Sequence, residues 1–383
     1  MFRILQRISV RSLILTNALT AIAYGIASWH LSDRPLLGFL SLLLPYLLLL
    51  LVCHLIGWLL VKPLYALPTL FLLIATHASI RQVLPIHPGQ DFSQAPPEGS
   101  LRVMTWNLRS FTPFDKIFSE PGNAIRHGFL FDEVQRFSPD VVCFQELTDA
   151  AKESSEDPVD ILRRQMGYRY HFFPGDELGS QHTVRYGTAI FSKHPILRAA
   201  QVRYSGTRFS NSEHTLWADL LWNGDTVRVH VMHLQSYRFL PGDYRTLAKM
   251  REDSDQGLHG ALLMYRKLRN NFIDHAEQSR WLRGILDTCR YPMLVCADLN
   301  NVPASYAYRT LLKDGKDTFT EKGTGFGRTY INPLSRWMGS LPTLRIDYIL
   351  TSPIFETLQV TRGKARLSDH QAVVADLRLP QKE

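Results

Sequence analysis

The chain has 383 residues, of which 45% are hydrophobic and 20% are charged, and its formal net charge is +8. This composition is typical of folded proteins and excludes a chain that is disordered along its whole length. The first 80 residues account for +4 of the charge, and the other +4 is spread over the rest of the chain, which is too little to indicate a nucleic-acid-binding surface.

Three apolar segments fill most of the first 80 positions, and each is a candidate membrane span. They cover residues 12–28, 36–61 and 63–79. The second is longer than the roughly 20 residues needed to cross the hydrocarbon core of a bilayer. The third is short and contains Pro63 and Pro68, so a re-entrant or interfacial segment is an alternative. We therefore expect a membrane anchor of about three transmembrane helices.

Basic residues around these segments predict the orientation of the anchor. Arg3, Arg7 and Arg11 precede the first segment, and Lys62 separates the second from the third. A basic start before an apolar stretch is also typical of signal peptides, but here a further apolar segment follows instead of a mature domain. Because basic residues favour the cytoplasmic side, three crossings place the domain after the anchor on the extracytoplasmic side. If the third segment does not cross, this prediction inverts.

The chain divides into three parts by composition. Residues 1–81 form the membrane anchor, and residues 82–100 hold four prolines and two glycines, which is typical of a linker. A new domain begins at residue 101 and extends to residue 383. We expect an integral, multi-pass membrane protein that carries one large domain.

Short apolar runs alternate with helical patterns beyond residue 100. The runs that predict strands are residues 101–108, 140–147, 186–196, 215–222, 225–234, 291–300, 344–352 and 372–379. Helical periodicity covers residues 126–137 and 272–289. Strand-rich halves with intervening helices predict an α/β domain in which two sheets pack face to face beneath outer helices.

Polar side chains follow these apolar runs at or beside the points where they end. They are Asn107, Glu146, His233, Asp298, Asn300, Asp347, Asp369 and His370. Burying so many polar and charged groups would cost several kcal/mol for each unpaired charge. A divalent cation and a phosphate group would give them a common partner, so the pattern indicates a metal-dependent site for phosphate chemistry.

The oxygen ligands favour a hard cation. Glu146 and Asn107 offer carboxylate and amide oxygens, which suit Mg²⁺ or Mn²⁺, whereas zinc sites prefer thiolate and imidazole ligands. Glu146 also has a simpler interpretation, as a cap of the helix that follows it. A magnesium or manganese site is the hypothesis that uses both residues together.

The remaining polar residues suit the chemistry of a phosphoryl group. Asp298 can orient or deprotonate a water molecule, with Asn300 holding that water or a phosphate oxygen. His233 and His370 can donate to phosphoryl oxygens as negative charge grows on them, and Asp347 can fix the tautomer of His370. Taken singly, these residues are also common as turn formers or structural histidines.

Six motifs, in chain order, carry a resemblance to a known family. They are TWNL (105–108), FQEL (144–147), MHLQS (232–236), ADLNNVPAS (297–305), RIDYIL (345–350) and LSDHQAV (367–373). They resemble the ordered motifs of the endonuclease/exonuclease/phosphatase superfamily, which includes apurinic endonucleases, deoxyribonucleases, inositol polyphosphate 5-phosphatases and bacterial sphingomyelinases. The match extends over residues 101–380, and it implies a four-layered α/β sandwich with two packed mixed sheets.

The resemblance implies a role for each motif residue. Glu146 resembles the principal metal ligand, with Asn107 beside it and Asp369 as the carboxylate next to the metal. Asp298 and Asn300 resemble the pair that positions the attacking water.

The histidines carry the other implied roles. His370 with Asp347 resembles the family's His and Asp dyad, and His233 resembles a histidine of the nuclease and sphingomyelinase branches. The sequence departs from the family pattern at Ala297, where glycine is usual, and at Arg109, where some members have an acid. Because Arg109 stands where an acid would be, the sequence does not identify the residue for one accessory contact to the metal or the substrate.

The main hypothesis is a membrane-tethered, Mg²⁺-dependent phosphoesterase that hydrolyses a phosphodiester or phosphomonoester by in-line attack of water. Nucleic acid, a phospholipid headgroup and a sugar phosphate are the alternative substrates. A catalytically silent surface-binding module on the same fold is the alternative from another class. Residues 323–333, with three glycines and Arg328, predict a mobile loop at the mouth of the site. The oligomeric state is not indicated.

Overall fold

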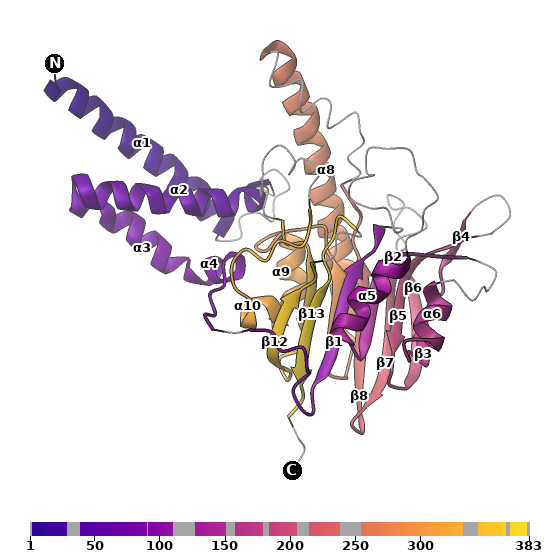
Figure 1. Ribbon diagram of the computed structural model, residues 1–383. Coiled ribbons are helices and arrows are strands. Elements are labelled where there is room, and N and C mark those ends of the chain that lie inside the picture. The colour runs from indigo at the N-terminus through magenta and orange to yellow at the C-terminus, as the bar shows by residue number, and fades with distance from the viewer. Residues whose placement is uncertain are drawn as a thin grey trace.

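A computed structural model describes most of the chain (Figure 1). The described residues are 2–28, 39–89, 91–109, 127–150, 158–178, 184–204, 214–237, 254–331, 344–364 and 368–380. The connection between the first two predicted spans and the last two residues of the predicted loop 323–333 lie outside them.

The N-terminal part folds into helices that extend away from the domain (Figure 1). They are α1 (Phe2–Ser28), α2 (Phe39–Val61), the 3-10 helix η2 (Pro63–Ala66), α3 (Leu67–Ala75) and α4 (His77–Val83). Two of them are long and apolar enough to cross a membrane, over Val10–Ser28 and Leu40–Val61. The stretch from Pro63 to Val83 is bent by 66° at its break and counts as a third span only if the bent pair is one crossing. Three crossings therefore stay a prediction.

The bent third segment returns to the end of the bundle where α1 finishes and α2 begins. Tyr24 near the end of α1, Leu40 at the start of α2 and Val83 at the end of α4 share one apolar cluster. The Ser79 hydroxyl donates to the carbonyl oxygen of Ser28 at 3.0 Å. The end of α4 consequently lies beside the C-terminal end of α1.

Two mixed sheets form the domain. The first contains β1 (Leu101–Asn107), β2 (Val141–Ala150), β3 (Tyr170–Phe172), β4 (Asp176–Leu178), β5 (Val184–Ser192), β12 (Glu356–Arg362) and β13 (Val373–Arg378), in the order β12-β13-β1-β2-β5-β3, with β4 paired to β5. The second contains β6 (Ile196–Arg203), β7 (His214–Trp222), β8 (Asp225–His233), β9 (Met293–Asp298), β10 (Lys316–Asp317) and β11 (Asp347–Thr351), in the order β10-β11-β9-β8-β7-β6. The pairs β1·β2 and β8·β9 are parallel, and the other pairs are antiparallel.

Alternation along the strands explains the layers, because successive side chains point to opposite faces of a sheet. In β1, Leu101 and Val103 enter the core between the two sheets, whereas Met104 and Trp106 pack on the outer side of the first sheet. Every residue of β1 is buried, including the polar residues Arg102, Thr105 and Asn107.

Helices cover both outer faces of the sandwich (Figure 1). Next to the first sheet lie α5 (His127–Phe137) and α6 (Pro158–Arg164), and next to the second lie α8 (Ser254–Asp287) and α9 (Tyr306–Leu312). The short α10 (Thr318–Lys322) packs against β12. The predicted four-layered α/β sandwich with two packed mixed sheets is confirmed.

The sequence patterns missed several elements and shortened one. The strands β3, β4, β6, β10 and β12 were not predicted, and α8 begins at Ser254 instead of near residue 272. β3, β4 and β10 have only two or three residues, too few to show a period of two. In β12 only Thr357 is buried and the other residues are partly or fully exposed, so no apolar alternation marks it.

The segment before β1 packs along the domain. The buried guanidinium of Arg102 donates to Asp376 at 2.6 and 2.7 Å and to the carbonyl oxygens of Ser93 and Gln94 at 3.0 and 2.6 Å. The ring of Phe92 lies 4.8 Å from the same guanidinium. The middle of the predicted linker therefore contacts the domain, and the linker boundaries stay a prediction.

Candidate active site at one edge of the sandwich

The strand topology brings the predicted site residues to one edge of the sandwich. Asn107 is the last residue of β1, and its parallel neighbour β2 carries Glu146 just beyond the end of the pairing. His233 and Asp298 end the parallel strands β8 and β9 and lie opposite each other in the register. Asp347 begins the antiparallel strand β11 directly beside Asp298. Because parallel strands finish at the same edge of a sheet, these side chains converge.

A local irregularity in β2 aims Glu146 into the site. The pairing of β2 with β5 shifts register between Phe144 and Leu147, and Glu146 has a positive φ of 52°. A bulge of this kind redirects one side chain, and bulges are frequent next to active sites. The Asn107 amide nitrogen then donates to Glu146 at 3.1 Å and to Asp298 at 2.9 Å.

Asp298 is fully buried at the centre of the site. Its Oδ1 accepts from the backbone N–H of Asn300 at 2.9 Å, and Oδ2 accepts from Asn107. Burial raises the pKa of Asp298 to about 6; the nearby Asp347 adds to this rise, whereas His370 opposes it. The Asn300 side chain donates to the carbonyl oxygen of Leu234 at 2.9 Å, which leaves its amide oxygen as the group that can accept a further hydrogen bond.

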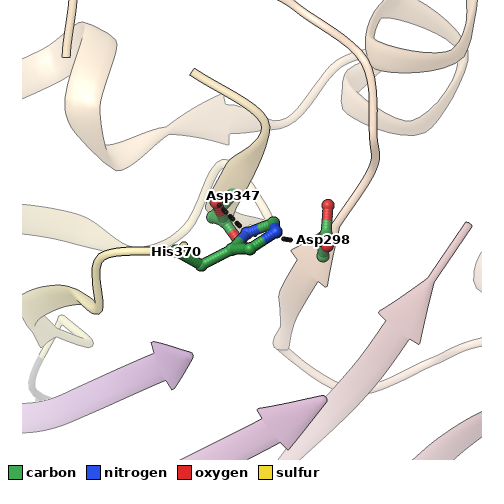
Figure 2. A group of neighbouring side chains, drawn as sticks. All are labelled: Asp298, Asp347 and His370. Atoms are coloured by element: carbon green, nitrogen blue, oxygen red, sulfur yellow. Dashed lines mark hydrogen bonds and ion pairs between the residues drawn. The ribbon is translucent and has the colours of Figure 1, made fainter. Parts of the chain in front are cut away.

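His370 and Asp347 form a buried pair (Figure 2). The Nδ1 atom of His370 lies 3.0 Å from both carboxylate oxygens of Asp347 and 3.7 Å from Oδ2 of Asp298. Burial alone would lower the pKa of His370, but the carboxylates of Asp347 and Asp298 together raise it well above its usual value. These carboxylates therefore favour the protonated imidazole, in which Nε2–H would be a second donor.

His233 faces two carboxylates without bonding to either. Its Nε2 atom lies 3.6 Å from Glu146 and 3.7 Å from Asp298. This nitrogen is buried and has no hydrogen-bond partner among the residues that the structure describes. An orphaned buried nitrogen beside two carboxylates indicates a site that is completed by a further group.

Asp369 is shared between His370 and Arg109. Its Oδ1 atom lies 4.0 Å from Nε2 of His370, and its Oδ2 atom lies 3.3 Å from a terminal nitrogen of Arg109. Burial raises the pKa of Asp369, and both cations oppose this rise. The structure therefore pairs Arg109 with the carboxylate that we predicted to lie next to the metal.

The structure adds residues that sequence reasoning did not assign to the site. The ring of Tyr330 lies 5.1 Å from the ring of His370, and the indole nitrogen of Trp106 donates to the carbonyl oxygen of His370 at 3.0 Å. Tyr186 hydrogen-bonds to Glu146. Burial raises the pKa of Tyr186, and the negative charge of Glu146 raises it further. Trp106 lies inside the TWNL motif, but no sequence signal distinguishes the two tyrosines from packed aromatic residues.

The segment that was expected to be a mobile loop is tied to the site over its described part. The Thr329 hydroxyl accepts from the backbone N–H groups of Ile346 and Asp347 at 3.0 and 3.1 Å. The backbone N–H of Ile331 donates to the carbonyl oxygen of Asp369 at 2.6 Å. Residues 329–331 thus support Asp347 and Asp369 directly.

Two sets of residues compete as the metal site. Among the described residues, the ligand atoms of Asp298, Asp347 and His370 lie within 4.8 Å of one another, close enough to hold an ion. Nδ1 of His370, however, is hydrogen-bonded to Asp347, and the raised pKa of His370 favours the protonated imidazole, which does not bind a metal. The proximity within this trio is explained by charge pairing (Figure 2), so Glu146 with its neighbours stays our prediction for the metal.

Comparisons with known proteins identify the family. The family sequence model described as Endonuclease/Exonuclease/phosphatase family matches residues 104–370, which is more than half of the chain. The chain belongs to this family. A second model, described as a domain of unknown function, matches residues 7–83. A search of curated proteins finds no match.

Solved structures share the fold of this family member. An endonuclease/exonuclease/phosphatase from Beutenbergia cavernae is 21% identical, with a TM-score of 0.52, over 74% of this chain and 72% of that one. D. rerio TDP2 in complex with a single-strand DNA product is 17% identical, with a TM-score of 0.51, over 73% and 100%. The human Nocturnin catalytic domain with a bound sulfate anion is 16% identical, with a TM-score of 0.50, over 75% and 100%. At these identities the likeness concerns the fold.

Proposed function

We propose that the chain is a membrane-tethered, metal-dependent phosphoesterase that hydrolyses a phosphodiester or phosphomonoester by in-line attack of water. The observation that carries this proposal is the convergence of Asp298, Asp347, His370, His233 and Glu146 at one edge of the sandwich. Membership of a family of phosphoester hydrolases supports the reaction class.

The residues present fit a hard divalent cation such as Mg²⁺ or Mn²⁺. The carboxylates of Glu146 and Asp298 converge: the Asn107 amide nitrogen lies 3.1 and 2.9 Å from them, and Nε2 of His233 lies 3.6 and 3.7 Å from them. Carboxylate and amide oxygens are the ligands these cations prefer. In the proposal Glu146 is the principal ligand, with Asn107 and Asp369 beside it. When bound, the ion would polarise a phosphoryl oxygen and stabilise the leaving oxygen.

The other residues would move the proton and hold the phosphoryl group. Asp298 accepts the proton of the attacking water, and the amide oxygen of Asn300 orients that water. Nε2 of His370 donates to a phosphoryl oxygen while Asp347 stabilises the imidazolium. His233 supplies the second donor through its orphaned Nε2.

Hydrolysis of bis-p-nitrophenyl phosphate in Mg²⁺ or Mn²⁺ tests the proposal against the alternative of a silent binding module. We expect release of p-nitrophenol that stops when the metal is chelated. Folded protein that shows no hydrolysis in either metal would favour the binding module.

Replacing Glu146 with Gln is expected to weaken metal affinity, because a neutral amide replaces the carboxylate ligand. Activity should fall at low Mg²⁺ and recover in part when Mg²⁺ is raised or Mn²⁺ is used. The measurement is the rate against metal concentration for the parent and the variant. A variant with the parental metal dependence and rate would assign Glu146 a structural role.

We further propose that the domain is extracytoplasmic. Three basic residues, Arg3, Arg7 and Arg11, lie in the N-terminal part of α1, at or before the start of its apolar span, and the return of Val83 to the end of α1 supports three crossings. An alkaline phosphatase fusion after residue 100 should be active, since that reporter folds only after export. A green fluorescent fusion at the same position should be dark. The opposite pair of results would place the domain in the cytoplasm.

A further inference from the structure

The anchor packs directly against the domain beside the catalytic edge. Phe326 and Ala304 of the domain belong to the same apolar cluster as Tyr24, Leu40 and Val83. These three anchor residues lie at the end of α1, the start of α2 and the end of α4, and the first two belong to the ends of the two candidate spans. The same ends of the helices therefore meet the domain (Figure 1).

Hydrogen bonds fix this contact in one orientation. The backbone N–H of Gly325 donates to the carbonyl oxygen of Pro85 at 2.9 Å. The buried guanidinium of Arg345 donates to the carbonyl oxygen of Gln82 and to Asp317, each at 2.6 Å. Because a buried cation that loses a partner costs several kcal/mol, Arg345 holds the end of α4 firmly against the domain.

The chain length between docked and catalytic residues limits their separation. Phe326 is four residues from Tyr330, whose ring lies 5.1 Å from that of His370. Ala304 is four residues from Asn300 on a separate segment. Four residues extend at most about 14 Å, so both routes place the catalytic edge within about 14 Å of residues that contact the span ends.

With the span ends at the boundary of the hydrocarbon core, a separation of at most about 14 Å keeps the catalytic edge within the headgroup region of a bilayer or within about 10 Å of it. The hydrocarbon core is about 30 Å thick and the whole bilayer about 40–45 Å, which leaves roughly 5–8 Å of headgroup region on each side. At the same junction Ile86 is 69% exposed and Arg81 is exposed. An outward apolar side chain with a nearby cation fits a lipid surface.

Resting on the proposed function, we infer that the site acts on phosphoesters carried by the headgroups of lipids in the membrane that holds the anchor. A dissolved substrate can reach a site in any orientation, whereas a headgroup is confined to the bilayer surface. The fixed contact through Phe326 and Arg345 keeps the catalytic edge at that surface. A polynucleotide is the competing substrate.

Fluorescence quenching in vesicles tests the placement. The full chain, with Cys53 and Cys289 replaced by Ala, carries a dye on Lys322→Cys near the docked loop or on Asn223→Cys. Asn223 precedes β8, which extends about 26 Å from there to His233, so it lies at the opposite end of the sandwich. Lipids with a nitroxide on the headgroup should quench the dye at position 322 several-fold more than at 223. Equal quenching, or stronger quenching at 223, would overturn the inference.

Activity on three substrates separates the inference from the proposed function. The reconstituted chain, in vesicles of phosphatidylglycerol and phosphatidylcholine with Mg²⁺, is given bis-p-nitrophenyl phosphate or a single-stranded oligonucleotide, and headgroup release is measured in parallel. We expect headgroup release and hydrolysis of the soluble ester. Hydrolysis of the soluble ester without headgroup release, with or without cleavage of the oligonucleotide, would overturn the lipid assignment alone. If none of the substrates is hydrolysed, the result contradicts the proposed function itself.

A docking variant completes the test. Phe326→Ser should lower the ratio of headgroup release to hydrolysis of the soluble ester by at least about tenfold, because the catalytic edge is no longer oriented to the membrane surface. Leu221→Ser, at an exposed position near the opposite end of the sandwich, is the matched control and should leave this ratio unchanged. Retained hydrolysis of the soluble ester shows that each variant is folded. An unchanged ratio in Phe326→Ser would count against the inference.

Discussion

Replacing Asp298 with Ala is expected to lower kcat by at least about a hundredfold, the usual scale for the loss of an acid–base group. Asp298 is fully buried at the centre of the site, where it contacts Asn107 and the Asn300 backbone. In the proposed mechanism its carboxylate takes the proton of the attacking water. KM should change much less, since the histidines that would hold the phosphoryl group remain.

The pH profile gives this prediction a second readout. Since burial raises the pKa of Asp298 to about 6, the carboxylate form is lost as the pH falls through that value. The parental kcat/KM should therefore decrease below about pH 6. Asp298→Asn keeps the size of the side chain and can still accept from Asn300, so it should be as slow as the Ala variant and lack this acid limb. If Asp298→Asn kept the parental rate, Asp298 would act only as a structural hydrogen-bond acceptor.

Replacing His370 with Ala is the second large effect, again at least about a hundredfold in kcat, because a transition-state donor is lost. The hydrogen bond of Nδ1 to Asp347 leaves Nε2 to donate, and the two neighbouring carboxylates raise the pKa of the imidazole, which favours its protonated form. Steady-state kinetics on bis-p-nitrophenyl phosphate measure the change. Asp347→Asn should reproduce part of it, since the imidazolium loses a stabilising charge.

A histidine at the opposite end of the sandwich provides the matched control. His194 follows β5 at the end that pairs with the start of β2, away from Glu146. His194→Ala should keep the parental kcat, and thermal unfolding should show that the His370 variant is folded. Near-parental turnover of a folded His370→Ala protein would remove this residue from the mechanism.

Local patterns predicted the framework of the domain well. The runs around β1, β2, β8 and β9 were apolar enough to be identified as strands, and the polar residues at their ends were identified with them. The structure brings these residues to one edge, with Asp298 and Asp347 adjacent in the register. The short or exposed strands β3, β4, β10 and β12 were missed because edge strands of this kind carry no clear periodicity.

The amino-acid sequence by itself determined the apolar helices, the buried strands and the kinds of polar side chain that end them, because these depend on residues close together in the chain. Only the tertiary structure decided the pairing of Arg109 with Asp369, the position of Tyr330 beside His370 and the contact of Phe326 with the anchor. Each of these joins segments far apart in sequence. Their partners are selected by the way that the sheets and helices pack, and no local periodicity records that choice.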